Sequence, residues 1–317
     1  GLPLTLLERE PSHEVGVLEM GMSAAGEIKR LAEIAQPNIG VITNISEGHL
    51  VELKSLKNIQ SAKGELFDAL TEESTAIVNA DDPLVLELAR SLRAKTVTFG
   101  IDQPADVRAS EIESEDNIGF QFKVKLFDKT LSVRLPYLGY CNIYNTLAAL
   151  ATGHSLGIQE DAMTLGLENY QRMSQRNELT RHKGVDLIND SYNANPRSMT
   201  EALKTLDSFR TQGRRIFAIG DMLELGDLSI PAHENLGEEI SRSKVNILIA
   251  VGKLASLAAK NTRALAGNKI KVLEFADHQE AAEFLIREAT SGDCVMFKGS
   301  RGSAMEKILQ IFNTNKN

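Results

Sequence analysis

Short apolar runs rich in Val and Ile alternate with amphipathic stretches over the first hundred residues of the chain. The runs indicate strands, and the stretches between them indicate helices. The predicted strands are residues 15–20, 40–45, 76–80 and 96–100, and the predicted helices are residues 25–35, 58–70 and 84–92. Such alternation is typical of βαβ units, so it predicts a parallel sheet with helices packed on it.

The pattern then changes to strict alternation of apolar and polar residues, which favours half-buried antiparallel strands. Three segments show it, separated by turn residues: DVRASEIES, GFQFKVKLF and TLSVRLPYL. Two helical stretches follow, at residues 142–157 and 160–171. We therefore expect a small antiparallel section after the parallel one.

A polar stretch without periodicity, residues 172–180, marks a predicted domain boundary. A second βαβ series follows it. Its predicted strands are residues 185–189, 215–219, 246–251, 271–275 and 294–298. The sequence thus predicts an α/β protein of two domains, residues 1–174 and residues 175–317, the second resembling a Rossmann fold.

Composition narrows the class of protein. A length of 317 residues is enough for two domains with separate cores. The net charge of −8 argues against a partner such as nucleic acid or a membrane surface, and no apolar run approaches the roughly 18 residues of a membrane span. The two cysteines, Cys141 and Cys294, have neither metal-type spacing nor the density of a disulfide framework, which fits a reducing cytoplasm.

Three ionisable residues of different kinds lie near strand or helix ends in the first domain. Glu19 follows the apolar run VGVL, His49 lies in the loop after VITNI, and Lys63 lies in an apolar helical run. Ligands of parallel sheets bind beyond the carboxyl ends of the strands. A carboxylate and an imidazole there suit Mg²⁺ or Mn²⁺. The structural alternative is a helix cap, a loop histidine and a surface lysine.

Two loops of the second domain also carry candidate chemistry. In LINDSYNANPRSM a strand ends at Asp190, and Asn193 follows before a helix. In VMFKGSRGSAMEKIL a strand runs into Lys298, Ser300 and Arg301, again before a helix, which is typical of an anion site. Turn formation alone would also explain both segments. The chain contains no G-x-x-x-x-G-K-[ST] motif.

Taken in order along the whole chain, these segments resemble the Mur ligase family, and most closely its member that adds D-alanyl-D-alanine. The segments that carry the resemblance are GLPLTLL, EMGM, TNISEGHL, AKGELF, CNIYNTLAAL, NDSYNANPRSM, GDMLELG and KGSRG followed by ME. The resemblance implies a P-loop-type ATPase central domain, truncated at its start, and a Rossmann-like C-terminal domain.

The activity implied by this resemblance is ATP-dependent amide ligation in bacterial peptidoglycan precursor synthesis. The substrates would be UDP-N-acetylmuramoyl-tripeptide and D-Ala-D-Ala, joined through an acyl phosphate by a monomeric cytoplasmic enzyme. By the same resemblance, Glu19, His49 and a carbamylated Lys63 would hold Mg²⁺ and act in catalysis. ATP would be bound by Asn142, Asn145, Arg176, Asp190 and Asn193, and the dipeptide by Lys298, Ser300 and Arg301.

Three features depart from the family pattern. The domain that grips the UDP-sugar and the P-loop are absent from the sequence, and Cys141 stands where the family has histidine. We therefore expect a fragment that does not ligate by itself. The alternatives are a sibling ligase that adds another amino acid, against which YNANP and GDMLELG argue, and a non-catalytic nucleotide-binding module.

Overall fold

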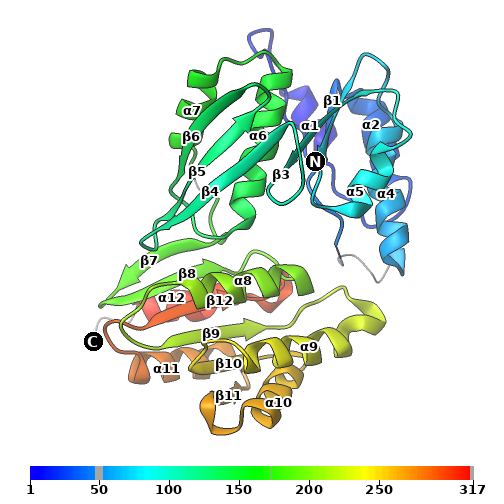
Figure 1. Ribbon diagram of the computed structural model, residues 1–317. Coiled ribbons are helices and arrows are strands. Elements are labelled where there is room, and N and C mark those ends of the chain that lie inside the picture. The colour runs from blue at the N-terminus through cyan, green and yellow to red at the C-terminus, as the bar shows by residue number, and fades with distance from the viewer. Residues whose placement is uncertain (47–52, 172, 315–317) are drawn as a thin grey trace. The chain divides into compact units, whose positions relative to one another are not determined.

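The computed structural model describes residues 1–46, 53–171 and 173–314 (Figure 1). The chain divides into two compact units. The first consists of Gly1–Ile112, Gln121–Val133 and Ile143–Glu168, and the second of Glu113–Phe120, Arg134–Asn142 and Asn169–Asn317. The contiguous domain division between residues 174 and 175 stays a prediction.

The first sheet has six strands in the order β1-β2-β3-β4-β5-β6. Its strands are β1 (Ile39–Ile42), β2 (Thr75–Asn79), β3 (Lys95–Gly100), β4 (Val107–Glu115), β5 (Gly119–Leu126) and β6 (Lys129–Leu135). Strands β1 to β4 pair in parallel. The links after β4 and β5, residues 116–118 and 127–128, are too short for a parallel crossover, as expected of the antiparallel section.

Among the described residues, the helices of this part of the chain match the predicted helical segments, and α1 is an addition at the start. They are α1 (Leu2–Leu7), α2 (Glu27–Ala35), α4 (Leu56–Asp68), α5 (Pro83–Ala89), α6 (Cys141–Ser155) and α7 (Glu160–Glu168). Helix α5 begins at the N-cap Asp82, whose carboxylate accepts hydrogen bonds from the Leu84 and Val85 N–H groups. The sequence places this cap directly before Pro83, a residue that favours the first turn of a helix.

The predicted strand at residues 15–20 is wrong. This segment has no regular secondary structure, and the side chains of Val15 and Val17 are 52% and 90% exposed. An apolar run forms a strand only where a neighbouring strand completes its main-chain hydrogen bonds. The segment pairs with no strand among the described residues, and Glu19 and Met22 lie in the loop before α2.

The second sheet has the order β11-β10-β9-β12-β8-β7. Its strands are β7 (Glu178–His182), β8 (Val185–Asp190), β9 (Arg215–Gly220), β10 (Ile247–Val251), β11 (Lys271–Phe275) and β12 (Cys294–Lys298). All pairs are parallel except β7 with β8. The five predicted strands are confirmed. Strand β7 was not predicted from the sequence, because a polar edge strand with no buried residue lacks an apolar pattern.

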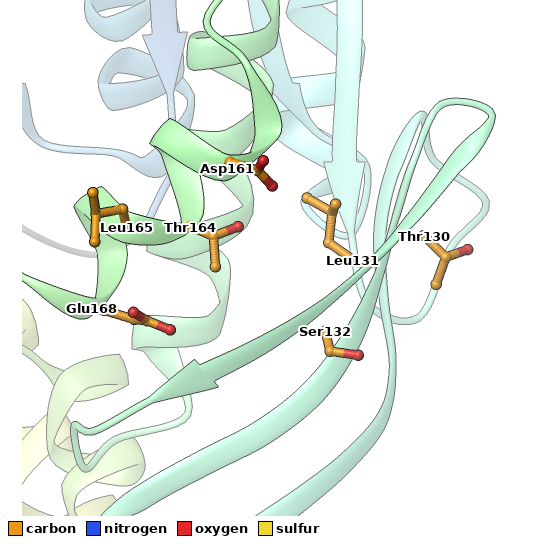
Figure 2. Close-up of a pocket in the computed structure, with 7 residues that line it drawn as sticks. All are labelled: Thr130, Leu131, Ser132, Asp161, Thr164, Leu165 and Glu168. Carbon is orange, nitrogen blue, oxygen red and sulfur yellow. The ribbon is translucent and has the colours of Figure 1, made fainter.

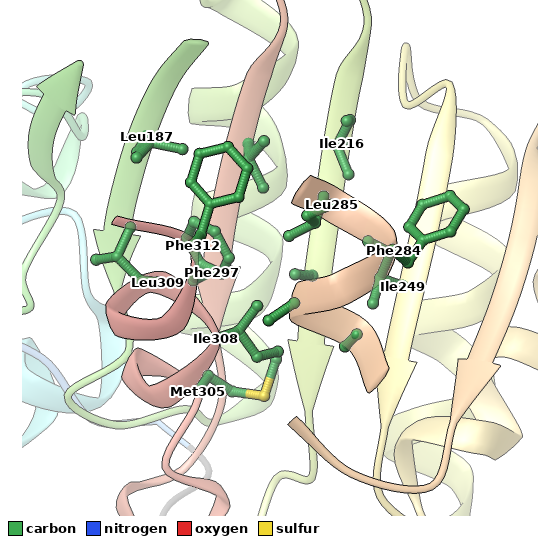
Figure 3. Close-up of a cluster of buried hydrophobic side chains, with 14 of the residues drawn as sticks. Leu187, Ile216, Ile249, Phe284, Leu285, Phe297, Met305, Ile308, Leu309 and Phe312 are labelled. Atoms are coloured by element: carbon green, nitrogen blue, oxygen red, sulfur yellow. The ribbon is translucent and has the colours of Figure 1, made fainter. Parts of the chain in front are cut away.

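Helices cover both faces of this sheet, so its central strands are mostly apolar and buried. The helices are α8 (Pro196–Ser208), α9 (Ser229–Ser241), α10 (Ala255–Ala266), α11 (His278–Glu288) and α12 (Glu306–Thr314), with short 3-10 turns η1 (Gly226–Leu228), η2 (Gly267–Lys269) and η3 (Arg301–Ser303). Figure 3 shows Phe284 and Leu285 of α11 and Ile308 and Phe312 of α12 packed on the strands. Burial on both faces is typical of parallel sheets.

Strand β12 lies between β8 and β9, although it is the last strand of the chain. The chain passes from β8 outward through β9, β10 and β11 and then returns to fill the gap. The order of the strands therefore reverses beside β12. In doubly wound folds, ligands bind beyond the carboxyl ends of the strands at such a reversal. Asp190 and Lys298 are the last residues of β8 and β12.

Candidate functional site

The loop after β1 is held by side chains from other elements. Lys63 of α4 donates a hydrogen bond from Nζ to the Asn44 carbonyl at 2.7 Å. Asn79, at the end of β2, donates from Nδ2 to the Thr43 carbonyl at 2.8 Å. Lys63 is half-buried. The lysine that the sequence singled out thus lies at the carboxyl end of a parallel strand, where a ligand is expected.

Helix α4 orients Lys63 because its apolar face, with Ile59 and Phe67, is buried. The same helix carries Glu65, which the sequence analysis missed. Its carboxylate accepts hydrogen bonds from the Gly26 N–H at 2.6 Å and the Lys29 N–H at 2.9 Å. These are N–H groups at the start of α2 that lack partners within the helix. Glu65 thereby ties the loop that follows Glu19 to the helix that carries Lys63.

The predicted metal ligands are only partly described by the structure. His49 lies outside the described residues. Glu19 is exposed, and it makes no hydrogen bond or ion pair with another described residue. Within the described ranges, no three His, Cys, Asp or Glu side chains form a group that could hold a metal ion. Of the three predicted metal ligands, the described residues include the exposed carboxylate of Glu19 and the amine of Lys63, and the Mg²⁺ site stays a prediction.

Helix α6 carries the two asparagines predicted to bind the adenine side of ATP. Asn142 donates from Nδ2 to the Leu138 carbonyl at 2.6 Å, so its amide closes the turn before the helix. Asn145 is exposed on the next turn. Asn142 thus has a local structural role, whereas the side chain of Asn145 faces outward.

Asp81, which follows β2, organises the neighbouring loop and α6. Its carboxylate accepts hydrogen bonds from the Ile101 and Gln103 N–H groups at 2.6 and 2.7 Å and from the Tyr144 hydroxyl at 2.9 Å. Burial by itself would raise the pKa of Asp81. The hydrogen bonds from Ile101, Gln103, Asp102 and Tyr144 outweigh burial and hold this pKa below its ordinary value. Asp81 therefore stays ionised at neutral pH.

In the second unit, the structure brings Asp190 and Lys298 together. They are register partners at the ends of β8 and β12. Lys298 Nζ lies 2.6 Å from Asp190 Oδ2, and it also donates to the Asn193 carbonyl at 3.1 Å. The side chains are only 3% and 14% exposed. This buried ion pair fixes the loop after β8, in which the sequence predicted ligand-binding residues.

Ser300 has a similar position in the second loop. It is buried, donates from Oγ to the Ala194 carbonyl at 3.1 Å and accepts from the Leu223 N–H at 2.8 Å. Its own N–H donates to the Asp221 carbonyl at 3.0 Å. Ser300 thus joins the segments YNANP, GDMLELG and KGSRG, which the sequence pointed to separately.

The two arginines among the predicted site residues are more exposed than Lys298 and Ser300. The Arg176 guanidinium lies 4.2 Å from the centre of the Tyr192 ring. Arg301 donates from Nη1 to Gln175 Oε1 at 2.7 Å, and its side chain is 64% exposed. Of the residues predicted here, Arg176 and Arg301 present charge to solvent, whereas Lys298 and Ser300 are buried supports.

Behind these loops lies a buried histidine that the sequence analysis did not single out. His233 of α9 accepts a hydrogen bond at Nε2 from the Met222 N–H at 3.0 Å, which leaves Nδ1 to donate to the Ser229 carbonyl at 2.6 Å. Burial lowers the pKa of His233, against the opposing effects of the Ser229 carbonyl and the Asp221 charge. A neutral imidazole therefore holds the GDMLELG loop.

A groove of about 520 Å³ lies elsewhere, between β6 and α7 of the first unit. Figure 2 shows its lining, which comprises Thr130, Leu131, Ser132, Asp161, Thr164, Leu165 and Glu168. None of the residues predicted from the sequence lines it. Its position on the edge strand of the sheet, away from the carboxyl ends of β1 to β3, separates it from the candidate site.

Comparisons with known proteins agree along the chain. Residues 1–153 match the Mur ligase middle domain, and residues 172–301 match the domain described as Mur ligase, glutamate ligase domain. The UDP-N-acetylmuramoyl-tripeptide–D-alanyl-D-alanine ligase of Bacillus subtilis is 35% identical over 98% of this chain and 66% of its own length. The enzyme of the same name from Escherichia coli is 32% identical over 99% of this chain and 69% of its own length.

Solved structures give the same result. Crystal structure I of MurF from Acinetobacter baumannii superposes with a TM-score of 0.89 at 30% identity, covering 99% of this chain and 68% of that one. The MurF ligase from Thermotoga maritima in complex with ADP gives 0.86 at 28% identity, covering 99% and 70%. The chain spans about two thirds of the length of these relatives. In sequence, fold and motif order, the chain belongs to the Mur ligase family.

Proposed function

We propose that this chain is the nucleotide-binding and dipeptide-adding part of an ADP-forming ligase that joins D-Ala-D-Ala to UDP-N-acetylmuramoyl-tripeptide. In this reaction the terminal carboxylate of the tripeptide attacks the γ-phosphate of ATP, giving an acyl phosphate and ADP. The amine of D-Ala-D-Ala then attacks the acyl carbon, and phosphate leaves. The protein contributes mainly positioning and electrostatic stabilisation.

The observation that carries this proposal is the assembly at the carboxyl ends of β8 and β12. Three segments typical of the D-alanyl-D-alanine-adding member, YNANP, GDMLELG and KGSRG, are joined there by Lys298 and Ser300. Relatives that align over nearly the whole chain carry the name of that ligase. A plain scaffold would not require these three loops to be joined by buried polar contacts.

For ATP, we assign the phosphates to Arg176, the adenine side to Asn142 and Asn145, and the remaining contacts to Asp190 and Asn193. The complex of the Thermotoga maritima MurF ligase with ADP supports a nucleotide as ligand. Arg176 is exposed, and a guanidinium can bind phosphate oxygens through two parallel hydrogen bonds.

For Mg²⁺, we assign Glu19, His49 and a carbamylated Lys63. The exposed carboxylate of Glu19 fits a hard cation, and Lys63 fits it only once its amine has become a carbamate anion. When bound, the cation would offset the charge of the phosphates and of the incoming carboxylate. Lys63 donates to the carbonyl of Asn44, five residues before His49 in the sequence, which supports assigning the two to one site.

For the dipeptide, we assign the carboxylate contact to Arg301, with Lys298 and Ser300 fixing the loops around it. Lys298 directs its ammonium group to Asp190 and Asn193, and Ser300 is buried, so neither side chain is exposed to an incoming substrate. A bidentate guanidinium matches a carboxylate in geometry as well as charge. We retain the bacterial cytoplasm and a monomeric state as parts of the proposal.

No helix in the described ranges has the length and apolar character needed to cross a membrane. A sibling ligase that adds a different amino acid is the main alternative within the family, and a non-catalytic nucleotide-binding module is the alternative outside enzymes. Phosphate release distinguishes them from our proposal: a sibling ligase would depend on a different amine, and a non-catalytic module would release no phosphate.

The test is phosphate release by the full-length protein that contains this chain, given ATP, Mg²⁺, UDP-N-acetylmuramoyl-tripeptide and D-Ala-D-Ala. L-Lys and D-Glu replace the dipeptide in control reactions. We expect release only with D-Ala-D-Ala. Release with another amine would keep the family and discard the substrate, and no release with any amine would favour the non-catalytic module.

The role of Lys63 can be separated from its charge in the same assay. Lys63→Arg keeps a cation that can donate to the Asn44 carbonyl, but it cannot form the lysine carbamate. We expect this variant to lose at least about 100-fold in turnover, because a catalytic anion is replaced by a cation. Near wild-type turnover would show that the hydrogen bond to the loop, and not a carbamate, is the function of Lys63.

A further inference from the structure

The segment Gln175–Asn177 has an unusual main-chain conformation. Gln175 has φ of 63° and Asn177 has φ of 49°, so two non-glycine residues in the left-handed region flank Arg176. Asparagine adopts this region with some frequency, but glutamine does so rarely. Such conformations persist only where surrounding contacts fix them, and they gather at functional sites. The contacts around this segment therefore show what fixes its conformation.

Main-chain contacts attach the segment to the loop after β8. The Tyr192 N–H donates to the Gln175 carbonyl at 3.1 Å. The Asn177 N–H donates to Asp190 Oδ1 at 3.2 Å, while Oδ2 of the same carboxylate receives Lys298. The buried ion pair at the ends of β8 and β12 thus fixes the position of the segment as well. We call residues 175–177 together with residues 190–192 the clamp.

The clamp holds a guanidinium on each side. Arg176 lies over the Tyr192 ring, 4.2 Å from its centre, which is within the range of a cation–π contact. Arg301 donates to the Gln175 side chain at 2.7 Å, and its Nη1 lies 3.5 Å from Glu306 Oε1. The Tyr192 ring itself is 43% exposed. An exposed aromatic ring on a loop that is otherwise polar needs an explanation, and the arginine above it provides one.

We propose that Tyr192 is a positioning residue for Arg176, and that the clamp sets the direction in which this guanidinium meets the phosphates of a nucleotide. A free arginine side chain samples many rotamers, and ordering it on binding lowers affinity. The ring confines the guanidinium before the nucleotide arrives. This inference rests on the proposed nucleotide-binding role of Arg176 and extends it to a residue outside the predicted set.

The experiment measures ADP affinity calorimetrically in the full-length protein. The variants are Tyr192→Leu, Tyr192→Phe, Arg176→Ala and the double variant Tyr192→Leu/Arg176→Ala. Tyr170→Leu serves as the matched control, because Tyr170 is also a half-exposed tyrosine of the second unit. Thermal unfolding of each variant shows whether it is folded at the temperature of the titration.

We expect Tyr192→Leu to weaken ADP binding about two- to five-fold, the loss that corresponds to one exposed cation–π contact. Tyr192→Phe and Tyr170→Leu should bind as the wild type does. Arg176→Ala should weaken binding about ten-fold or more. The double variant should be no weaker than Arg176→Ala alone, because Tyr192 acts through the arginine.

Two results would overturn the inference. Unchanged affinity in Tyr192→Leu would show that the ring does not position Arg176. Additive losses in the double variant would show that Tyr192 contacts the nucleotide independently of the arginine. A wild-type protein that does not bind ADP would instead refute the proposed function, and the role of the clamp with it.

Discussion

At the scale of single residues, buried charges and hydrogen-bonding groups hold the loops of the candidate site. Asp190 and Lys298 are the last residues of β8 and β12, and Ser300 is buried in the loop that follows β12. A buried charge is tolerated only when it is paired and hydrogen-bonded. Removing one of these residues would therefore destabilise the protein mainly because its buried partner would lose a hydrogen bond or an opposite charge.

Lys298→Met should destabilise the protein by about 3–5 kcal/mol, because it leaves the carboxylate of Asp190 largely buried without its cation. Chemical denaturation of the full-length protein measures the change. The matched control is Lys204→Met, which removes an exposed ion pair to Glu201 and should change stability by no more than about 0.5 kcal/mol. Equal losses of stability in Lys298→Met and Lys204→Met would contradict the inference that burial makes the Lys298–Asp190 pair the more costly one to break.

The low pKa of His233 predicts a loss of stability on acidification. In the unfolded chain this histidine titrates near 6.5, whereas in the folded protein its pKa is lower. As the pH falls below about 6.5, the unfolded chain takes up a proton that the folded protein does not, so the free energy of unfolding decreases. The decrease ends once the pH has passed the folded-state pKa. Above about 6.5, His233 is neutral in both states and contributes no pH dependence.

His233→Gln should therefore show a smaller loss of stability than the wild type when the pH is lowered from 7.5 to 5.5. Denaturation midpoints at several pH values provide the comparison. The variant itself should be less stable at pH 7.5, because the Met222 N–H and the Ser229 carbonyl lose a well-placed partner. Parallel curves for the two proteins would mean that other groups account for the acid sensitivity.

At the scale of elements, sequence patterns predicted most strands and helices correctly because most elements bury one face or both. The strand predicted at residues 15–20 was wrong because the apolar character of a segment does not show whether a neighbouring strand can pair with it. Strand β7 was missed because its sequence is polar. It is a strand because its main chain pairs with β8. Pairing between strands is a tertiary property, and a local pattern does not contain it.

Close packing of α9 against α10 gives a prediction about Gly237. A Cβ atom at this position would lie 2.5 Å from the Ala258 carbonyl oxygen and 2.8 Å from the Cβ atom of Asn261. Gly237→Ala should destabilise the protein by about 1–3 kcal/mol, because the helices must move apart. Gly166→Ala in α7 should instead be neutral or stabilise by up to about 1 kcal/mol, since no atom lies within 4 Å there. Chemical denaturation of both variants tests whether packing or helix propensity determines the change in stability at each position.

At the scale of the whole molecule, the chain divides into two compact units. The proposed nucleotide binding can be tested on the stability of the protein as a whole. A ligand that binds only the folded protein stabilises it in proportion to the logarithm of its concentration. Stability in the presence of nucleotide is therefore a test of the site that does not require turnover.

ADP at 100 times its Kd should raise the free energy of unfolding of the full-length protein by about 2.7 kcal/mol. Denaturant titration with and without ADP measures this change. Arg176→Ala, at the same ADP concentration, should show a smaller increase because its affinity is lower. The absence of any increase in the wild type at saturating ADP would contradict nucleotide binding by the folded state.

The sequence by itself determined the α/β class, the second sheet's five apolar strands, and the family, through motifs such as YNANP and AKGELF. These properties are local in the chain: apolar periodicity follows from burial of one face, and a motif is a run of adjacent residues. It also pointed to Lys63, Asp190, Lys298 and Arg301 as chemically important.

Only the tertiary structure decided what these residues do to one another. It paired Lys298 with Asp190, buried Ser300 among three loops, capped α2 with Glu65, and placed Arg176 on Tyr192. Each of these contacts joins positions far apart in the chain or separated by a turn. Burial and distance determine whether a charged side chain holds a loop or meets a ligand, and both are set by how the strands are ordered in the sheet.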